Sequence, residues 1–496
     1  MQKIIDYKTH FSNRSIFYFL IFITLALFSF SALLETHPHN DGAGFDGLFY
    51  RDVAQSFLST IKTEGYDSFR IHRIFPFFVL NLIFSWCSIE TNNTNLMYGI
   101  YFFHYINLFI QFLFFFKIAK FLKWTHSTKL ILFSCLFFNY FNLKNSPYEP
   151  FQTDAFAISL SFISYYYILC KKTFLSLFFS ILAFITLPLT AFLNIILLLF
   201  SQPKNKNLKA YSVPLFKLLP SLYLGAVFLI LLLIKLFKNE NTLNILLLSN
   251  ASKFFFISNA FLTTIFLYCI MKKAQINKIP HYKSFFFQFS IKNLFLFLSP
   301  FILTKFILSF YTNSNYYYDS SLFLSLIILR PLKYPLIFLV NHITYWGILA
   351  ILVILFFNSF YKNFIRISTG HYLVFFVFLF FSLDSESRHI LSFLPFIFSA
   401  LGYTLNELKI SKKALSFLVV FQVILSHFYI PINKEGTLKA MQEGDFFTFP
   451  AQWYFMNFGP WLHTKSYLFW ATISFFSIVF VYFLIKKTPR WPRRLD

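Results

Sequence analysis

The chain has 496 residues, of which 57% are hydrophobic and only 12% are charged. A soluble domain carries about 25% charged residues, so the composition excludes an ordinary soluble protein and predicts an integral membrane protein. The net charge of +24 comes from short Lys and Arg clusters between apolar stretches, which is the pattern of orientation signals facing an anionic leaflet. We therefore expect membrane lipids and no nucleic acid among its partners.

Apolar stretches long enough to cross a bilayer recur along the chain, whereas the alternating segments of a membrane β-barrel are absent. This pattern predicts an all-α integral membrane fold, a polytopic helical bundle of roughly 12 to 14 transmembrane helices. We expect a single membrane domain over residues 1–496, without a soluble domain. Its parts are a first outer loop (35–94), an N-terminal helix module (95–237) and a C-terminal helix module (238–496).

Residues 15–34 are predicted to form the first crossing, and the N-terminus is expected in the cytoplasm because basic residues predominate there. The loop that follows is then outside. Residues 73–89 are apolar and nearly long enough to cross, but a crossing there would place the basic residues of 117–129 outside. We therefore expect 73–89 to form an amphipathic helix that lies on the outer surface.

The other apolar stretches are predicted to cross in alternating directions. They are 97–116, 130–143, 155–170, 173–201 (as two short helices that meet near Pro188), 215–237, 254–270, 294–311, 341–361, 371–383, 389–404, 414–430 and 467–485. The basic C-terminus then falls in the cytoplasm. Of the 19 acidic residues, only Asp6, Glu407 and Asp496 fall on the inner side. Acidic residues orient membrane proteins weakly, so this bias predicts a polar site on the outer face.

The first outer loop contains the sequence DGAGFDGLFYRDVA, in which Asp46 lies on a turn before a helical stretch. A carboxylate just above the membrane can meet a lipid-borne and a water-borne substrate, and it can remove a proton from an attacking hydroxyl. Asp46 is therefore the first candidate for a general base and Asp41 the second, and Tyr50 is a candidate substrate-binding residue. The alternative is that both acids only form turns, because Asp-Gly is common in turns.

A basic segment, YDSFRIHRIFPF, leads into the predicted surface helix. It lies at the depth of lipid phosphates, where an Arg side chain can bind a phosphate through two hydrogen bonds. We expect Arg70 and Arg73 to bind a donor phosphate and His72 to contact the substrate. The alternative is that these side chains only anchor the helix among the lipid headgroups.

Two further clusters are expected at the outer ends of helices. In DSESRHILSFLPF, Arg388 and His389 are candidate phosphate ligands, although the preceding acids could equally pair with Arg388 to close a hairpin. In NSPYEPFQTDAF, Glu149 and Asp154 are candidate substrate-binding residues, and a helix N-cap is the alternative for Asp154.

Other polar residues predict structure more than chemistry. Arg330 and Lys333 are expected to anchor the chain at the outer surface, and His342 is expected to pack inside the bundle. The pair His37 and His39 is a weak signal, so no metal or other cofactor is predicted. No nucleotide-binding motif occurs in a supporting context, so a group donor would have to arrive on a lipid.

Together these pieces resemble the glycosyltransferase C superfamily, whose polytopic members use polyprenyl-phosphate sugars. The resemblance rests on the order of four elements: the acidic DGAGFDGLFY, the basic RIHRIFPFFVL, the acidic turn SPYEPFQTDAF and the late element SRHILSFLPF. The chain is most similar to the bacterial branch related to protein O-mannosyltransferases and GPI mannosyltransferases. The resemblance covers the N-terminal half and, in the C-terminal half, only the last element.

The resemblance implies an inverting transfer of a sugar from a polyprenyl-phosphate donor to a glycan, lipid or protein acceptor. It implies a site on the periplasmic face of a bacterial inner membrane. It implies an Asp of the first loop as general base, for which Asp46 is the best match and Asp41 the second, and Arg388 as the ligand of the departing phosphate. The chain departs from the family pattern because Asp41 and Asp46 are not adjacent and because no C-terminal soluble domain follows.

Three alternatives to this function remain open. A transporter or flippase of lipid-linked saccharides would need charged groups along a path through the bundle, where only Lys305 and, less clearly, Lys235 are expected. An O-antigen polymerase or ligase is expected to place its main loop late in the chain, and here the charged loop comes early. A non-catalytic assembly subunit would not depend on Asp46.

Overall fold

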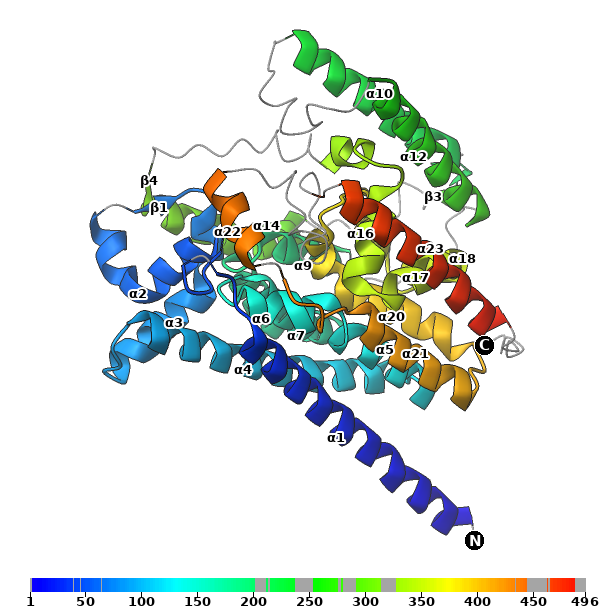
Figure 1. Ribbon diagram of the computed structural model, residues 1–496, viewed down its shortest axis with the longest axis horizontal. Helices are drawn as coiled ribbons and strands as arrows, with labels where there is room; N and C mark the ends of the chain where they lie inside the picture. The colour runs from blue at the N-terminus through cyan, green and yellow to red at the C-terminus, as the bar shows by residue number, and fades with distance from the viewer. Residues whose placement is uncertain are drawn as a thin grey trace.

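The computed structural model describes residues 2–38, 40–44, 46–63, 65–200, 211–212, 215–236, 253–274, 278–279, 291–313, 327–432, 434–443, 462 and 464–486. The described chain is mostly helical, and its strands are short pairings of two residues each. It forms an all-α bundle in which long and short helices pack against one another (Figure 1).

The helices begin and end close to most of the predicted stretches. In the first half they are α1 (Gln2–Leu34), α2 (Gly47–Thr63), η1 (Arg70–Arg73), α3 (Phe75–Trp86), α4 (Asn93–Phe121), α5 (His126–Phe137), η2 (Phe141–Asn145), α6 (Ser146–Tyr148), α7 (Asp154–Leu169), α8 (Thr173–Phe184), α9 (Pro188–Leu199) and α10 (Leu215–Leu236). In the second half they are α12 (Lys253–Lys273), α14 (Ile291–Ser309), η3 (Arg330–Leu332), α16 (Ile337–Trp346), α17 (Ile348–Leu355), α18 (Phe357–Arg366), α19 (Thr369–Phe381), η4 (Ser387–Phe393), α20 (Leu394–Asn406), α21 (Lys412–Leu425), α22 (Lys434–Glu443) and α23 (Thr464–Lys486). The strands are β1 (Tyr66–Asp67), β2 (Tyr211–Ser212), β3 (Lys278–Ile279) and β4 (Thr312–Asn313).

Several helices begin where the sequence supplies a capping oxygen or a proline. The side chains of Asn92, Thr125 and Ser411 accept backbone N–H groups at the starts of α4, α5 and α21, which satisfies donors that have no partner within the helix. Pro188 lies in the first turn of α9, where its missing N–H costs nothing. The division of 173–201 into two short helices near Pro188 is therefore confirmed.

The helices run between two ends of the bundle, which we name the loop end and the basic end. At the loop end, the backbone N–H of Ile432 donates to Glu35 Oε2 at the end of α1 (3.0 Å). At the basic end, the N–H of Thr125 before α5 donates to Asn406 Oδ1 at the end of α20 (2.9 Å). In Figure 1, α2 and α3 lie at the left with the loop end, and the N-terminus and the end of α23 lie at the lower right with the basic end.

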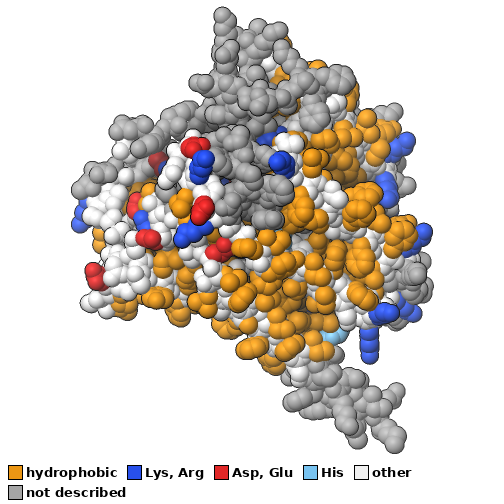
Figure 2. Space-filling model, viewed as in Figure 1, with side chains coloured by type: hydrophobic (Ala, Val, Ile, Leu, Met, Phe, Trp, Pro, Cys, Tyr) orange, Lys and Arg blue, Asp and Glu red, His pale blue; other side chains and the backbone are white. Residues whose placement is uncertain are grey.

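Much of the surface between the two ends is apolar. On the face shown in Figure 2, acidic side chains gather on the left, a broad band of hydrophobic side chains covers the middle, and Lys and Arg lie along the right edge. Four stretches of the described chain are long and apolar enough to cross a membrane: Ser15–Leu34, Asn93–Phe121, Ser387–Asn406 and Thr464–Lys486. Eight further apolar helices have 10–17 residues. The protein thus has several helices that could span a membrane, with fewer long spans than the roughly 12 to 14 predicted crossings.

The prediction of one continuous crossing over 341–361 is wrong, because the chain there forms three short helices, α16, α17 and α18. Gly347 separates the first two with φ 61° and ψ −129°, a conformation that side-chain-bearing residues rarely adopt. The break admits the side chain of Gln422, whose Oε1 accepts the N–H of Ile348 (2.7 Å). The axes of α17 and α18 then diverge by 89°. An apolar run alone does not reveal such breaks.

The helices α2 and α3 of the first loop share a small core of their own with α4. Tyr50 stacks on Phe77 with ring centroids 4.9 Å apart, and Asn81 Nδ2 donates to the carbonyl of Ala54 (2.9 Å). The helix α3 has 12 residues and is therefore about 18 Å long, shorter than the hydrocarbon core of about 30 Å. The helices α5, α8 and α9 have the same length, so the expectation that 73–89 does not cross stays a prediction.

Candidate functional site

A cavity of about 590 Å³ lies at the loop end of the bundle, and we call it the cationic cavity. Its lining residues are Ser68, Phe69, His72, Arg73, Asp154, Leu187, Pro188, Leu189, Lys305, Leu308, Ser309, Thr312, Phe381, Arg388 and His389. Three side chains in this lining are permanently basic and two are histidines, whereas only one is acidic. The remaining wall is largely apolar. The cavity is therefore suited to an anionic group attached to an apolar chain.

The cavity is built by segments that are far apart in the sequence. The strand β1 of the first loop pairs in parallel with β4 after α14, so that Tyr66 lies opposite Thr312. The N–H of Phe75 donates to the carbonyl of Ile185 (3.0 Å), which fixes the start of α3 on the turn between α8 and α9. These contacts hold the basic segment of the first loop against α9, α14 and η4.

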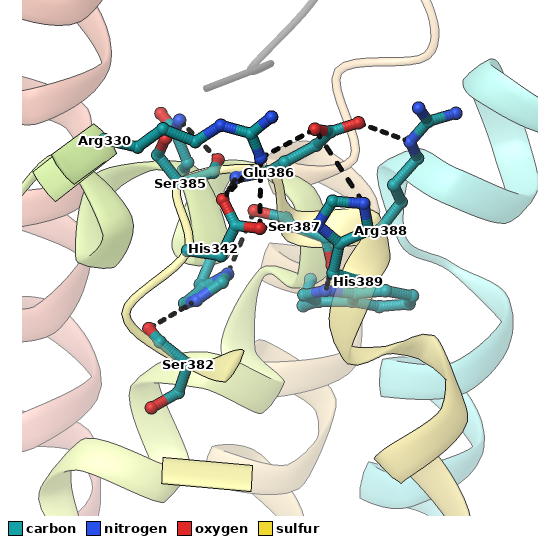
Figure 3. A network of polar contacts seen from close by, with 11 residues as sticks. Arg330, His342, Ser382, Ser385, Glu386, Ser387, Arg388 and His389 are labelled. Atoms are coloured by element: carbon teal, nitrogen blue, oxygen red, sulfur yellow. Dashed lines mark hydrogen bonds and ion pairs between the residues drawn. The ribbon is translucent and has the colours of Figure 1, made fainter. Parts of the chain in front are cut away.

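One wall of the cavity is held by a network of ion pairs around the turn between α19 and η4 (Figure 3). Arg330 Nη1 lies 2.9 Å from Asp384 Oδ1 and 2.9 Å from Glu386 Oε2. Arg388 Nε donates to the second oxygen of Glu386 (2.6 Å), and His389 Nδ1 donates to Asp384 Oδ2 (2.5 Å). Asp384 and Glu386 thus position Arg388 and His389, which are two of the residues that line the cavity.

The same turn is fixed from behind by α16. His342 Nε2 donates to the carbonyl of Ser382 (2.9 Å), so its Nδ1 accepts from the hydroxyl of Ser387 (3.0 Å). Trp346 Nε1 donates to the carbonyl of Ser387 (3.1 Å). His342 is buried and hydrogen-bonded, as expected of a residue that packs inside the bundle.

The buried acids of this turn are ionised because cations surround them. Burial alone would raise the pKa of Glu386, but Arg388, His389 and Arg330 hold it well below its usual range. Burial likewise opposes the charge of Asp384, and Arg330 and His389 lower its pKa. The other ring nitrogen of His389, Nε2, lies 3.9 Å from Glu386 Oε2, so both acids contact this imidazole.

Asp46 is not among the described lining residues of the cationic cavity, but its charge interacts with that of Arg388, which lines the cavity. Arg70 donates to Asp46 Oδ1 through Nε (3.1 Å) and Nη2 (2.8 Å), and Arg70 Nη1 also lies 3.5 Å from Asp67. Within the described part of the chain, Asp46 Oδ2 accepts no hydrogen bond. Arg70 therefore orients Asp46 through one oxygen and leaves the other available.

Glu149 and Asp154 are two buried acids whose charges interact with that of Arg388. Asp154 lines the cavity, with Oδ2 4.0 Å from Arg388 Nη1. Glu149 is only 3% exposed, and its Oε1 has no hydrogen-bond partner among the described residues. Burial raises the pKa of Glu149 to about 8; the charge of Arg388 lowers it, and those of Asp154 and Asp46 raise it. Asp46 and Arg388 thus act on the same carboxyl group, although 342 positions separate them in the numbering (388 − 46).

The structure brings five of the ten predicted site residues to one cavity. His72, Arg73, Asp154, Arg388 and His389 all line the cationic cavity. Burial, then the charges of Lys305 and Arg73, lower the pKa of His72, which favours its neutral form.

Other predicted site residues lie outside the described lining. Tyr50 is buried behind Arg73 and hydrogen-bonds to it. Arg70 binds Asp46 rather than lining the cavity. Asp41 is exposed, and its Oδ2 accepts from Asn93 at the start of α4 (3.1 Å). Asp41, the second candidate base, therefore has a structural hydrogen-bond partner.

Sequence reasoning missed three cations. Arg330 and Lys333 were expected at the outer surface, but they are 4% and 2% exposed, and this expectation is wrong. Arg330 compensates the two buried acids, and Lys333 Nζ donates to the carbonyl of Leu462 (2.7 Å). Lys305 was expected only as a charge inside a helix, yet it lines the cavity. The sequence DSESR contained a signal for a buried cation. Its two acids precede a single Arg, so burial of both acids would require a second cation from elsewhere in the chain.

Among the described residues, no group of three His, Cys, Asp or Glu side chains is arranged to hold a metal ion. His39 lies outside the described residues. Comparison of the chain with protein-family models, with curated proteins and with solved structures finds no match. The chemistry of the site therefore has to be argued from its own residues.

Proposed function

We propose that this protein is a membrane glycosyltransferase that moves a sugar from a polyprenyl-phosphate donor to an acceptor hydroxyl. The observation that supports this proposal best is the meeting of an early acidic loop and a late basic turn at one cavity. Asp46 and Arg388 influence the same buried carboxyl group, and Arg388 lines the cavity beside it.

The lining of the cavity matches the two parts of such a donor. Arg73, Arg388 and Lys305 supply positive charge for the phosphate, and Arg can bind a phosphate through two parallel hydrogen bonds. The apolar residues of the lining, among them Leu189 and Phe381, suit the isoprenoid chain. A purely aqueous substrate would leave this apolar wall without a role.

In the proposed reaction, Asp46 Oδ2 removes the proton of the acceptor hydroxyl, whose oxygen attacks the anomeric carbon of the sugar. The bond between that carbon and the phosphate oxygen breaks on the opposite side, so the configuration inverts. The electron pair remains on the lipid phosphate, which Arg388 and His389 stabilise. Preorganised cations act most strongly where charge develops in a poorly hydrated site.

The proposed orientation follows from the positions of the charges. The loop end contains the acidic residues and the cationic cavity, and the basic end carries Lys and Arg clusters. Basic residues face the cytoplasm in multi-pass proteins. We therefore place the site at the periplasmic face of a bacterial inner membrane, with both termini in the cytoplasm.

The test is transfer from a radiolabelled polyprenyl-phosphate sugar in membranes that contain the protein. The variant Asp46→Asn is expected to lower the rate by about 10²–10⁴-fold, because a general base contributes that much. The matched control is Asp52→Asn, an exposed acid of α2, the helix that follows Asp46, and this variant is expected to leave transfer unchanged. Equal rates in both variants at equal protein levels would remove Asp46 from the mechanism.

The role of Arg388 is tested in the same assay. Arg388→Ala is expected to raise the donor KM and lower kcat, since a phosphate ligand acts in both the bound and the departing state. The control is Lys439→Ala, at an exposed position of α22. An unchanged donor KM in Arg388→Ala would contradict the phosphate assignment.

A further inference from the structure

A second cavity, of about 770 Å³, lies at the basic end of the bundle, and we call it the far cavity. Its lining residues are Phe121, Leu122, Tyr167, Ile168, Leu169, Lys171, Thr173, Leu197, Leu198, Asn293, Leu296, Phe297, Ile367, Ser368, His371 and Tyr403. None of these residues lines the cationic cavity. The proposed glycosyl transfer gives the far cavity no role.

The two cavities lie at opposite ends of the same helices. The helix α7 runs from Asp154 at the cationic cavity to Leu169 at the far cavity, and α9 runs from Pro188 to Leu198 in the same sense. The helix α14 likewise reaches from Phe297 to Lys305. At a rise of about 1.5 Å per residue, the nearest lining residues of the two cavities lie about 20 Å apart along α7 (Asp154 and Tyr167) and about 12 Å apart along α14 (Phe297 and Lys305).

The far cavity combines apolar walls with one lysine in its described lining. Phe121, Leu296 and Phe297 supply apolar surface, and Lys171 is an exposed cation within the lining. The lining segments are flanked in the sequence by further exposed cations: Lys120, Lys123, Lys172 and Arg366. One exposed acid, Glu407, follows α20 at this end. Lys171 therefore brings a positive charge into the described lining, and these further cations follow or precede lining segments in the sequence.

The backbone holds two of these lysines in an unusual conformation. Lys171, directly after α7, has φ +57°, and Lys123, just after α4, has φ +53°. The N–H of Lys172 donates to the carbonyl of Tyr167 (2.9 Å), which closes the end of α7 as glycine usually does. A left-handed conformation costs a non-glycine residue about 1 kcal/mol or more.

We propose that the far cavity binds an anionic glycerophospholipid, with the headgroup phosphate at Lys171 and the acyl chains against Phe121, Leu296 and Phe297. A basic pocket between helices at the cytoplasmic side is suited to such a headgroup. The apolar wall distinguishes this occupant from a free anion, and the charge of Lys171 distinguishes it from a neutral lipid. The proposal does not depend on the proposed transferase activity.

The test measures lipid binding by native mass spectrometry of the full-length protein in detergent. The probes are phosphatidylglycerol, phosphatidylcholine and inorganic phosphate. We expect phosphatidylglycerol to bind several-fold more tightly than phosphatidylcholine. Phosphate at millimolar concentration is expected not to displace it, because phosphate makes no contact with the apolar wall. Equal affinity for the two lipids, or ready displacement by phosphate, would overturn the proposal.

Variants of Lys171 locate the site. Lys171→Gly removes the charge and suits the positive φ, so the fold is expected to be retained and the affinity for phosphatidylglycerol to fall about fivefold, the effect of one basic residue near an anionic lipid. Lys171→Arg is expected to retain binding. The control is Lys439→Gly, at an exposed site of α22. If Lys171→Gly binds phosphatidylglycerol as tightly as the wild-type protein, the headgroup does not lie at Lys171 and the proposal fails.

Discussion

The buried network around Arg330 makes a strong prediction about stability. The Arg330 side chain is 4% exposed, and its partners Asp384 and Glu386 are 0% and 5% exposed. Removing one member of a buried ion pair leaves an uncompensated charge and costs about 3–5 kcal/mol. Arg330→Met removes the group shared by both acids, so we expect a loss in the upper part of that range. By contrast, an exposed pair contributes about 0–1 kcal/mol.

The assay is the free energy of unfolding of the purified protein in detergent micelles, followed by tryptophan fluorescence. The control is Lys439→Met, which breaks the exposed pair with Glu443 (3.9 Å; side chains 60% and 53% exposed). The double variant Arg330→Met, Asp384→Asn is expected to recover part of the loss, because one buried charge is removed. A loss in Arg330→Met no larger than that in the control would refute the reasoning.

The same variant has a defined dependence on pH. The cations hold the pKa of Asp384 and of Glu386 below their usual values in the folded protein. Their stabilisation is therefore fully present above the unfolded values of about 4 and is lost as the pH falls below them. The difference in stability between the wild-type protein and Arg330→Met should accordingly be largest near neutral pH and shrink in acid.

Two further predictions concern Glu149 and Gly347. Since burial raises the pKa of Glu149 to about 8, this carboxyl is neutral at pH 7, and Glu149→Gln should keep transfer activity there. In the wild-type protein, transfer activity should fall above pH 8, because ionised Glu149 adds a negative charge near the phosphate site. This fall should be weaker in Glu149→Gln. An equal fall in both proteins would contradict the assignment of the alkaline pKa to Glu149. Gly347→Ala should destabilise by at least about 1–3 kcal/mol, because φ is +61° and a Cβ would lie 2.4 Å from Gln422 Oε1. The matched control, Gly225→Ala in α10, has nothing within 4 Å of a Cβ and should be neutral or slightly stabilising when unfolding is compared in micelles.

Much of the site was predictable because its residues stand out against an apolar chain. Arg73, Asp154 and Arg388 are ionisable groups at helix ends, where a membrane protein places few charges without a reason. The structure places all three at one cavity. Arg330 was not predictable in this way, because its neighbours in the sequence suggest an interfacial anchor, and its partners lie more than fifty positions away (384 − 330 = 54).

The sequence alone determined the helical class of this protein, the positions of most helices and the division near Pro188, because apolar periodicity, capping residues and proline act locally. Only the tertiary structure decided which charges are paired and which face a cavity. Whether Asp46 is held by Arg70, or Lys305 lies beside His72, depends on contacts between helices that are distant in the chain. The local sequence does not specify such contacts, because any of several cations could have compensated the buried acids Asp384 and Glu386.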